Sequence, residues 1–198
     1  MYEVLTILFD DFETLDAFGP VEILGRIKEK FSIHFYSLKG GIIKSSQDVP
    51  VLTKPLSEVP ENDYILIVPG GMGVRKLVDD ATFLNHLKNL FHNAEYVLTI
   101  CTGSILLSKT GLLDGKPATT NKRVFPWTSE FPKVEWVKKA RWVNEGNIYT
   151  SSGVSTGMDM TLGFVSDLLG YEVAKKQSTE IEYDWKEDST WDPFCELY

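Results

Sequence analysis

The residue best placed for covalent chemistry is a cysteine at the junction of an expected strand and an expected helix. Cys101 ends the apolar run 97–100 and is followed directly by Thr102 and a helical pattern. A thiol at such a bend lies beside a helix N-terminus, where exposed N–H groups and the helix dipole favour the thiolate. The segment TICTG at 99–103 is a cysteine version of the nucleophile elbow, with Thr99 at the first glycine position. The residues alone allow either a reactive nucleophile or a buried structural cysteine.

The acidic partner that the sequence offers to this thiol is Asp16. It follows the first apolar run, 4–9, and lies inside the apolar segment TLDAFGP at 14–20. A carboxyl group in apolar surroundings has a raised pKa and can share a proton with a nearby thiol. The alternative is a structural role, because Asp is a favoured N-cap and a helix is expected over 16–28.

The histidines offer no base to the thiol. His86 and His92 lie off the apolar stripe of their expected helix, which predicts solvated surface positions. His34 lies in the middle of an expected strand, where a packed side chain is the usual outcome. A Cys–His dyad of the protease or amidase type is therefore not expected.

Backbone donors are expected from two glycines that follow the buried run 64–68. Gly70 and Gly71 allow a backbone N–H to approach a ligand closely, as the donors of an oxyanion hole do. An ordinary tight turn explains the same two residues equally well.

Several residues near the C-terminus are expected to be structural. Ser155 or Thr156 is predicted to cap a helix over 155–169, and Asp159 in its first turn suits the helix dipole. The acidic, aromatic C-terminal tail is expected to cover a pocket or to pack at a subunit interface, and Cys195 within it is given no role.

The order of the expected elements defines the fold class. The sequence predicts core strands at 4–9, 31–38, 64–68 and 97–100, a β excursion at 41–53, later strands near 117–120, 134–143 and 147–151, and helices at 16–28, 82–93, 101–107, 155–169 and 171–182. Strands that alternate with helices indicate an α/β sandwich with a mostly parallel sheet. In such folds the sites form outside the carboxyl ends of the strands. No repeat or linker divides the chain, so one domain over 1–198 is expected.

Composition narrows the function classes. The chain has 198 residues, of which 43% are hydrophobic and 24% charged, and its net charge of −8 argues against a nucleic-acid partner. The two cysteines lie far apart, form no metal-ligand pattern and require no disulfide, so a cytoplasmic location is expected. No apolar run approaches the length of a membrane helix, and the N-terminus lacks the features of a signal peptide.

Four motifs together resemble the ThiJ/PfpI superfamily, a group similar to the class I glutamine amidotransferases. They are TLDAFGP at 14–20, IVPGGMG at 67–73, ICTGSILLSKTGLLDGKPATT at 100–120 and SSGVSTGMD at 151–159. Within the superfamily the likeness is greatest to the isonitrile hydratases and to the amidase-like domains of AraC-type regulators. It runs from about residue 4 to about residue 183 in the same order and spacing.

The resemblance implies a flavodoxin-like three-layer α/β/α sandwich, a homodimer, Cys101 as nucleophile and Asp16 as its acidic partner. Isonitrile hydratases carry Thr beside the nucleophile, as Thr102 here, whereas PfpI-type peptidases carry His. One departure is Asn121-Lys122, where the relatives usually have His-Trp, because Asn can hydrogen-bond but cannot shuttle a proton near neutral pH. The charged segment 184–188 also differs from the Pro-rich tail of the hydratases.

The expected function is a cysteine-dependent hydratase that adds water to an isonitrile and releases an N-substituted formamide. Cys101 would attack the terminal carbon and Asp16 would move the protons, while Thr102 and the amides of Gly70 and Gly71 orient the intermediate. A small-molecule substrate is expected, with no metal, organic cofactor or membrane partner. The alternatives are a cysteine-based oxidative-stress sensor, a ligand-binding domain cognate to the AraC-type regulators and, less favoured, a peptidase, amidase or glyoxalase/deglycase-type enzyme.

Overall fold

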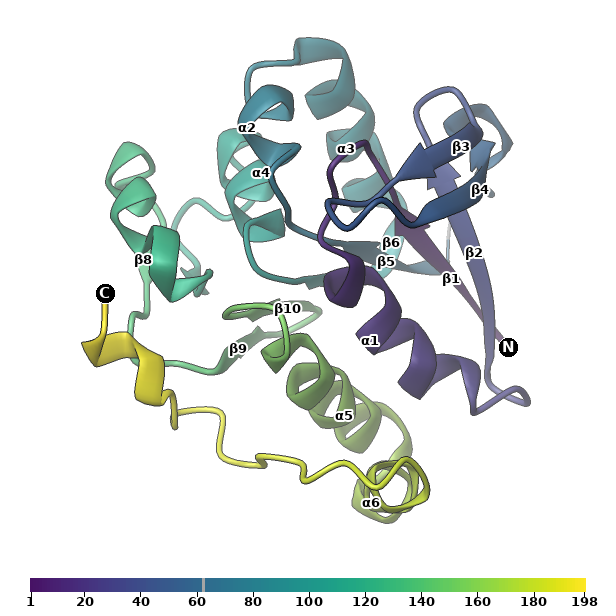
Figure 1. Cartoon of the computed structure of the whole chain (residues 1–198), viewed down its shortest axis with the longest axis vertical. Coiled ribbons are helices and arrows are strands. Elements are labelled where there is room, and N and C mark those ends of the chain that lie inside the picture. Colours follow the sequence, from purple (N-terminus) through teal and green to yellow (C-terminus); the bar gives the residue numbers. More distant parts are fainter. Residues whose placement is uncertain (62) are drawn as a thin grey trace.

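A twisted, mostly parallel sheet forms the centre of the molecule. The computed structural model describes residues 1–61 and 63–198, and within them the main sheet has eight strands in the order β3-β4-β2-β1-β5-β6-β10-β9 (Figure 1). Its strands are β1 (Tyr2–Ile7), β2 (Phe31–Ser37), β3 (Gly41–Lys44), β4 (Pro50–Pro55), β5 (Tyr64–Val68), β6 (Ala94–Thr99), β9 (Trp142–Glu145) and β10 (Ile148–Ser151). The strands from β4 to β10 in this order pair in parallel, and the edge strands β3 and β9 pair antiparallel. The mostly parallel α/β sandwich predicted from the sequence is therefore confirmed.

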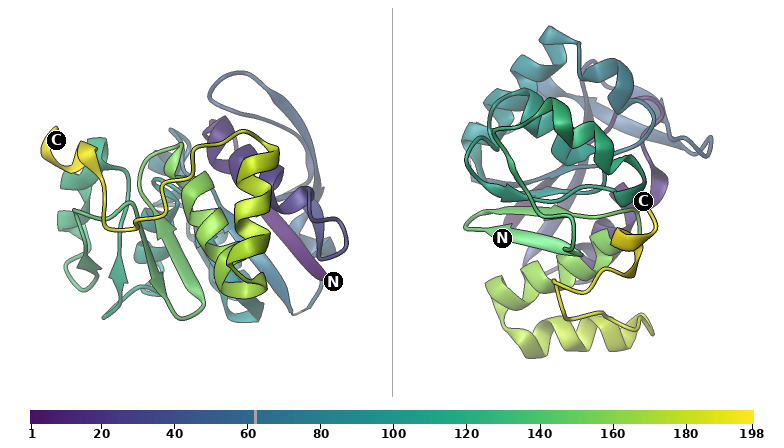
Figure 2. Two further views of the ribbon diagram at one scale, coloured as in Figure 1. Left: turned by 90° about the horizontal axis from the view of Figure 1, so that it is seen from below. Right: turned by 90° about the vertical axis from the view of Figure 1, so that its left-hand side faces the viewer.

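Helices cover both faces of this sheet and give three layers (Figure 2). One face carries α1 (Thr14–Gly25), α5 (Thr156–Leu169) and α6 (Tyr171–Glu180), and the other carries α2 (Val74–Leu77), α3 (Ala81–Asn93) and α4 (Gly103–Lys109). Short elements complete the chain: η1 (Leu56–Glu58), β7 (Pro117–Ala118), η2 (Lys122–Glu130), β8 (Glu135–Trp136) and η3 (Pro193–Glu196). Among the described residues, no helix combines the length and the apolar character that crossing a bilayer requires.

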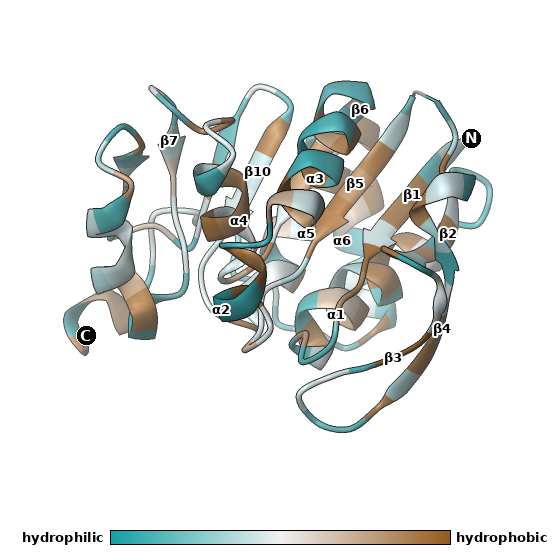
Figure 3. Ribbon diagram, turned by 90° about the horizontal axis from the view of Figure 1, so that it is seen from above, coloured by the Kyte–Doolittle hydropathy of each residue, from teal (hydrophilic) through white to brown (hydrophobic). Residues whose placement is uncertain are grey.

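The central strand β5 is apolar throughout because both of its faces are covered. All five residues of β5 are buried, with Ile65 and Ile67 in the core beneath α1 and α5, and Leu66 and Val68 in the core beneath α3 and α4. Figure 3 shows β5 as hydrophobic along most of its length. A continuous apolar run is the pattern that such a doubly covered parallel strand requires.

The largest differences from the sequence-based expectations lie at helix starts and near the chain's end. The first helix begins at Thr14, so Asp16 lies inside its first turn and does not cap it. Neither Ser155 nor Thr156 caps α5, because Ser155 has helical dihedrals and the Thr156 hydroxyl donates to Gly153 O at 3.0 Å. The expected strand 134–143 is divided into β8 and β9.

The C-terminal tail explains this division, because it occupies the backbone groups between the two short strands. Arg141 N donates to Ser189 O at 2.7 Å. The tail returns along α5 (Figure 1), and Trp185 is buried in the intramolecular core, with its indole Nε1 donating to Asp159 O. The Asp159 side chain accepts from Lys186 N at 2.9 Å and from Arg141 Nη2 at 2.6 Å. Asp159 thus anchors the tail, a larger structural role than the helix-dipole contact expected for it.

Candidate active site

Cys101 lies on a sharp strand-to-helix turn between β6 and α4. Its backbone φ of 56° falls in the left-handed region, which costs free energy for a residue other than glycine. Ile100 N donates to Val68 O and Gly103 N donates to Ile100 O, which fixes the reversal of the chain. A Cβ at Gly103 would lie 2.2 Å from Val68 O, so this turn requires glycine there. The bend that the TICTG segment predicted is present.

Three donors surround the Cys101 sulfur. Asn121 Nδ2 lies 3.1 Å from Sγ, and the backbone N–H groups of Thr102 and Val154 also donate to it. The Asn121 amide is held in this orientation because its Oδ1 accepts from Arg123 N at 2.9 Å. These donors can stabilise negative charge that develops on the sulfur or on an atom bonded to it.

Asp16 is a fully buried carboxyl group beside this thiol. Its Oδ2 accepts from Gly70 N at 2.9 Å, and its Oδ1 has no hydrogen-bond partner within standard geometry among the described residues. The Cys101 side chain lies close enough for each group to shift the pKa of the other. The structure therefore brings together the two residues that the sequence proposed as a pair.

Burial decides where the proton of this pair resides. It raises the pKa of the Asp16 carboxyl well above its ordinary value, and the bond from Gly70 N opposes this only in part. Burial and the negative charge of Asp16 raise the pKa of the Cys101 thiol, against the effect of the three donors. The expectation that the helix N-terminus favours a free thiolate is corrected here, because desolvation is the larger effect. The pair holds its proton until another group accepts it.

Gly70 and Gly71 connect residues of the site through their backbone N–H groups. Gly70 N is bonded to Asp16, and Gly71 N donates to Thr102 Oγ1 at 3.1 Å. A Cβ at Gly70 would lie 2.5 Å from both Thr102 N and Thr102 Oγ1. Close approach of the backbone is thus the reason for glycine at position 70, as expected. The N–H groups of Gly70 and Gly71 are, however, already hydrogen-bonded to Asp16 and Thr102, so they do not serve as oxyanion donors. The donors that face the sulfur are instead Asn121 and the Thr102 and Val154 N–H groups.

Sequence reasoning missed the roles of Asn121 and Val154. Val154 is a β-branched residue at φ 26°, which holds its N–H toward the sulfur at a conformational cost. The available signals were the Asn121 departure from the relatives and the segment 151–157, which was interpreted only as a helix start. The predicted absence of a histidine base agrees with the structure: His86 and His92 are exposed on α3, and His34 pairs with Glu3.

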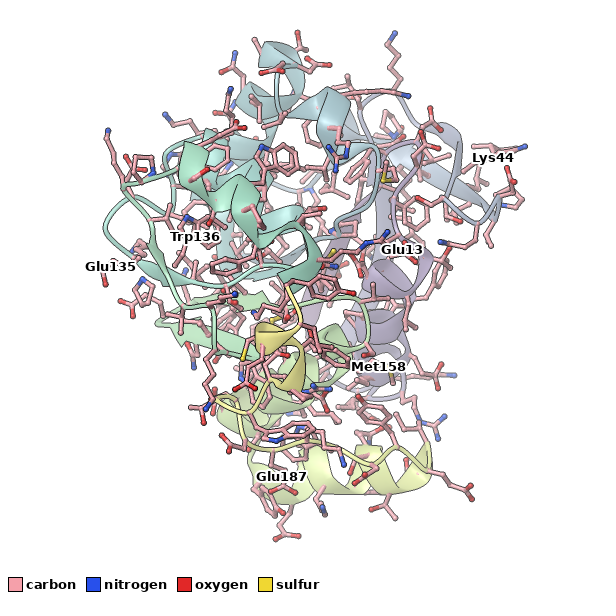
Figure 4. The ribbon with its side chains drawn as sticks, turned by 60° about the vertical axis from the view of Figure 1, so that its left-hand side comes forward. Glu13, Lys44, Glu135, Trp136, Met158 and Glu187 are labelled. Carbon is pink, nitrogen blue, oxygen red and sulfur yellow. The ribbon has the colours of Figure 1, made fainter. Side chains whose placement is uncertain are left out.

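A cavity of about 360 Å³ opens over the sulfur. Its wall comes from the turn before α1, where Figure 4 labels Glu13, from α2, from the Cys101 turn and from η2. The lining residues are Glu13, Gly71, Met72, Arg75, Cys101, Thr102, Asn121, Arg123, Val124, Trp127 and Val154. In the described part of the chain, no group of three or more His, Cys, Asp or Glu side chains is arranged to hold a metal ion.

Fold and site define a three-layer α/β/α protein with a cysteine at a strained strand-to-helix turn and a buried acid beside it. A sequence profile of the DJ-1/PfpI family matches residues 2–167, and the chain belongs to this family. The resemblance inferred from the four motifs is thereby confirmed.

Known relatives have different functions. Isonitrile hydratase from Pseudomonas putida is 29% identical over 183 residues, which is 89% of this chain and 76% of that protein. Protein DJ-1 homolog A from Arabidopsis thaliana is also 29% identical, over 87% of this chain and 44% of its own length. The transcriptional regulator CdhR from Pseudomonas aeruginosa is 24% identical over 84% of this chain and 50% of its own. Sequence identity alone does not separate a hydratase from the other members.

Solved structures confirm the fold. A ThiJ/PfpI family protein from Pseudomonas syringae superposes with a TM-score of 0.85 at 24% identity, covering 92% of this chain and 75% of the other. DJ-1beta from Drosophila melanogaster gives a TM-score of 0.81 at 22% identity, covering 93% and 99%. The flavodoxin-like sandwich is therefore shared with these two proteins.

Proposed function

We propose that this protein is a cysteine-dependent hydratase that converts an isonitrile, R–N≡C, and water into an N-substituted formamide. The observation that carries the proposal is a buried thiol close to a buried carboxyl, both with raised pKa, beside a cavity that has donors around the sulfur and no histidine among its lining residues. The likeness to isonitrile hydratase from Pseudomonas putida supports this choice of substrate class.

The first step joins the sulfur of Cys101 to the terminal carbon of the isonitrile. As the S–C bond forms, the proton held by the Cys101–Asp16 pair passes to that same carbon, which gives a thioimidate, R–N=CH–S–Cys. A raised pKa at both groups suits this step, because a proton is then present at neutral pH. The isonitrile carbon accepts this proton as the sulfur attacks.

The second step releases the product. The oxygen of water adds to the thioimidate carbon, and Asp16 relays one of the two water protons to the nitrogen, which becomes N–H. When the C–S bond breaks, the proton of the added hydroxyl passes to the sulfur, which leaves R–NH–CHO and the free thiol. The reaction neither oxidises nor reduces any group, so it needs no co-reactant beyond water.

The surrounding groups orient these steps. Asn121 Nδ2 and the Thr102 and Val154 N–H groups lie on the sulfur, where they support the charge of the attacking and leaving thiolate. The Thr102 hydroxyl accepts from Gly71 N and so joins the loop after β5 to the Cys101 turn. The Asn121 side chain donates a hydrogen bond but cannot transfer a proton near neutral pH. This suits addition of water to an isonitrile better than peptide hydrolysis.

The direct test is turnover of a simple alkyl isonitrile by the reduced protein, with the formamide quantified by NMR or mass spectrometry. Cys101→Ala and Asp16→Asn are the inactive controls, and circular dichroism establishes that each is folded. Absence of formamide with folded, fully reduced wild-type protein would refute the activity.

A second candidate is an oxidation sensor, because the same three donors would also stabilise a sulfinate at Cys101. The raised pKa of the thiol disfavours this function, since the thiolate is the form that peroxide oxidises. Mass spectrometry after mild peroxide distinguishes the two, because sensing requires selective oxidation of Cys101 over Cys195.

We also propose a cytoplasmic homodimer. Both cysteines, Cys101 and Cys195, are free thiols, which suits a reducing compartment. Size-exclusion chromatography with light scattering tests the dimer, and fractionation of the source cells tests the location.

A further inference from the structure

Two of the chain's four arginines line the cavity that contains the candidate nucleophile. Arg75 comes from α2 and Arg123 from η2, so the two side chains reach the cavity from separate elements. Both are exposed, whereas Cys101 is only 5% exposed. The positive groups therefore lie nearer the solvent, and the sulfur lies deeper.

These two arginines differ from the others in having no anionic partner among the described residues. Arg26 pairs with Glu22 and Glu180, and Arg141 forms its buried pair with Asp159. Arg75 and Arg123, by contrast, form no salt bridge within 4.0 Å and no side-chain hydrogen bond to any described residue. The chain has a net charge of −8 and therefore offers many carboxylates, yet neither guanidinium group in this cavity wall is paired with one in the described part of the chain.

The local surroundings hold the guanidinium groups without neutralising them. The Arg75 guanidinium lies over the Trp127 ring at 5.6 Å from its centroid, a contact that fixes the side chain and leaves its N–H groups free. Glu13 lines the same cavity and pairs with neither arginine at salt-bridge distance. Both arginines also border an adjoining groove of about 510 Å³, where Lys109 is already paired with Asp79 at 3.2 Å.

We infer that the substrate carries a carboxylate in addition to its isonitrile group, and that Arg75 and Arg123 bind this carboxylate at the cavity mouth. The inference rests on the proposed function and names its substrate class. A guanidinium presents a planar set of N–H donors that matches a carboxylate. A wholly neutral substrate would cover both cations without pairing them, which disfavours its binding. With the carboxylate held at the mouth, the isonitrile carbon extends inward to the sulfur.

The test compares isocyanoacetate with its neutral methyl ester. For wild-type protein we expect kcat/KM to be about tenfold or more higher for the acid, mainly through KM, and to fall as salt is added. Arg75→Gln and Arg123→Gln should each lower kcat/KM for the acid by about tenfold without lowering it for the ester. Arg26→Gln, which removes an arginine outside the cavity, is the matched control and should change neither. Equal kcat/KM for acid and ester, or equal losses on both substrates in the arginine variants, would overturn the inference.

A binding measurement separates this inference from the proposed chemistry. N-formylglycine and its methyl ester are titrated calorimetrically into the Cys101→Ala protein with and without Arg75→Gln and Arg123→Gln. Preference for the acid that is lost in the arginine variants supports the anion site even if no isonitrile is turned over. Turnover of both isonitriles without any preference for the acid in binding would leave the hydratase intact and refute the anion site.

Discussion

Two buried aspartates occupy similar places in this fold and have opposite surroundings. Asp16 lies in the first turn of α1 and Asp159 in the first turn of α5, and both are fully buried. Asp159 is saturated: Arg141 donates to Oδ2 through Nε and Nη2, and Lys186 N donates to Oδ1. Asp16 has one backbone donor, no described cation as partner and a thiol beside it.

The difference shows how one residue type serves structure in one place and chemistry in another. Burial raises the pKa of both carboxyl groups, but only at Asp159 does an arginine oppose the shift. A buried carboxylate that is paired on every side holds two segments together and is costly to alter. A buried carboxyl with an unused oxygen retains its proton and can transfer it.

Asp16→Asn provides the largest expected effect on activity. Without a transferable proton, turnover of an alkyl isonitrile should fall by about 10²- to 10⁴-fold, the usual contribution of an acid–base residue. The free energy of unfolding should change by less than about 1 kcal/mol, because Asn can still accept from Gly70 N and carries no buried charge. Steady-state kinetics and urea unfolding measure the two quantities. Loss of stability with activity retained would reverse the comparison.

Asp159→Asn should produce the opposite pattern. Removing the carboxylate leaves Arg141 buried without its anion, which should lower the free energy of unfolding by about 3–5 kcal/mol. At temperatures where the variant remains folded, kcat should stay within a few-fold of wild type, since Asp159 does not line the cavity. Chemical denaturation and kinetics at low temperature check this. A kcat reduced as far as in Asp16→Asn would show that the tail anchor also shapes the site.

Asn121→Ala is expected to have a smaller effect, confined to chemistry. It removes one of three donors to the Cys101 sulfur, so turnover should fall by about tenfold to a hundredfold and the pKa of the thiol should rise further. Thiol alkylation rates measured against pH report the pKa. Asn144→Ala is the matched control, because Asn144 donates to Tyr149 and Asp167 away from the sulfur and should alter neither quantity.

The pH dependence of stability provides the smallest and most specific effect. The folded-state pKa of Asp16 is raised above its ordinary 3.8, so the folded state binds more protons than the unfolded state between these values. The stability that Asp16 contributes is therefore complete below pH 3.8 and is lost as the pH rises through the folded-state pKa. Unfolding free energies of wild type minus those of Asp16→Asn should fall as the pH rises from about 4. A difference that rises with pH would mean that Asp16 is ionised and stabilised in the folded protein.

Much of the fold was predictable because a strand covered on both faces is a continuous apolar run, and a helix covered on one face has an apolar stripe. The expected strand 64–68 has the observed bounds of β5, and the expected helix 82–93 differs from α3 by one residue. Prediction was poorest where long-range contacts replace local preference. The expected strand 134–143 is interrupted because Arg141 N bonds to the C-terminal tail, a partner 48 positions away that no local pattern reveals.

The sequence by itself determined the layered α/β fold, the strand-to-helix turn at Cys101 and the proximity of Asp16 to it, because these follow from apolar periodicity, turn chemistry and recurring motifs. Only the tertiary structure decided the electrostatics. It placed Gly70 N on Asp16, placed Asn121 and Val154 on the sulfur, and left Arg75 and Arg123 without an anionic partner among the described residues. Hydrogen bonding and desolvation depend on which groups from distant segments meet in space, and that information is not carried by any residue type or spacing alone.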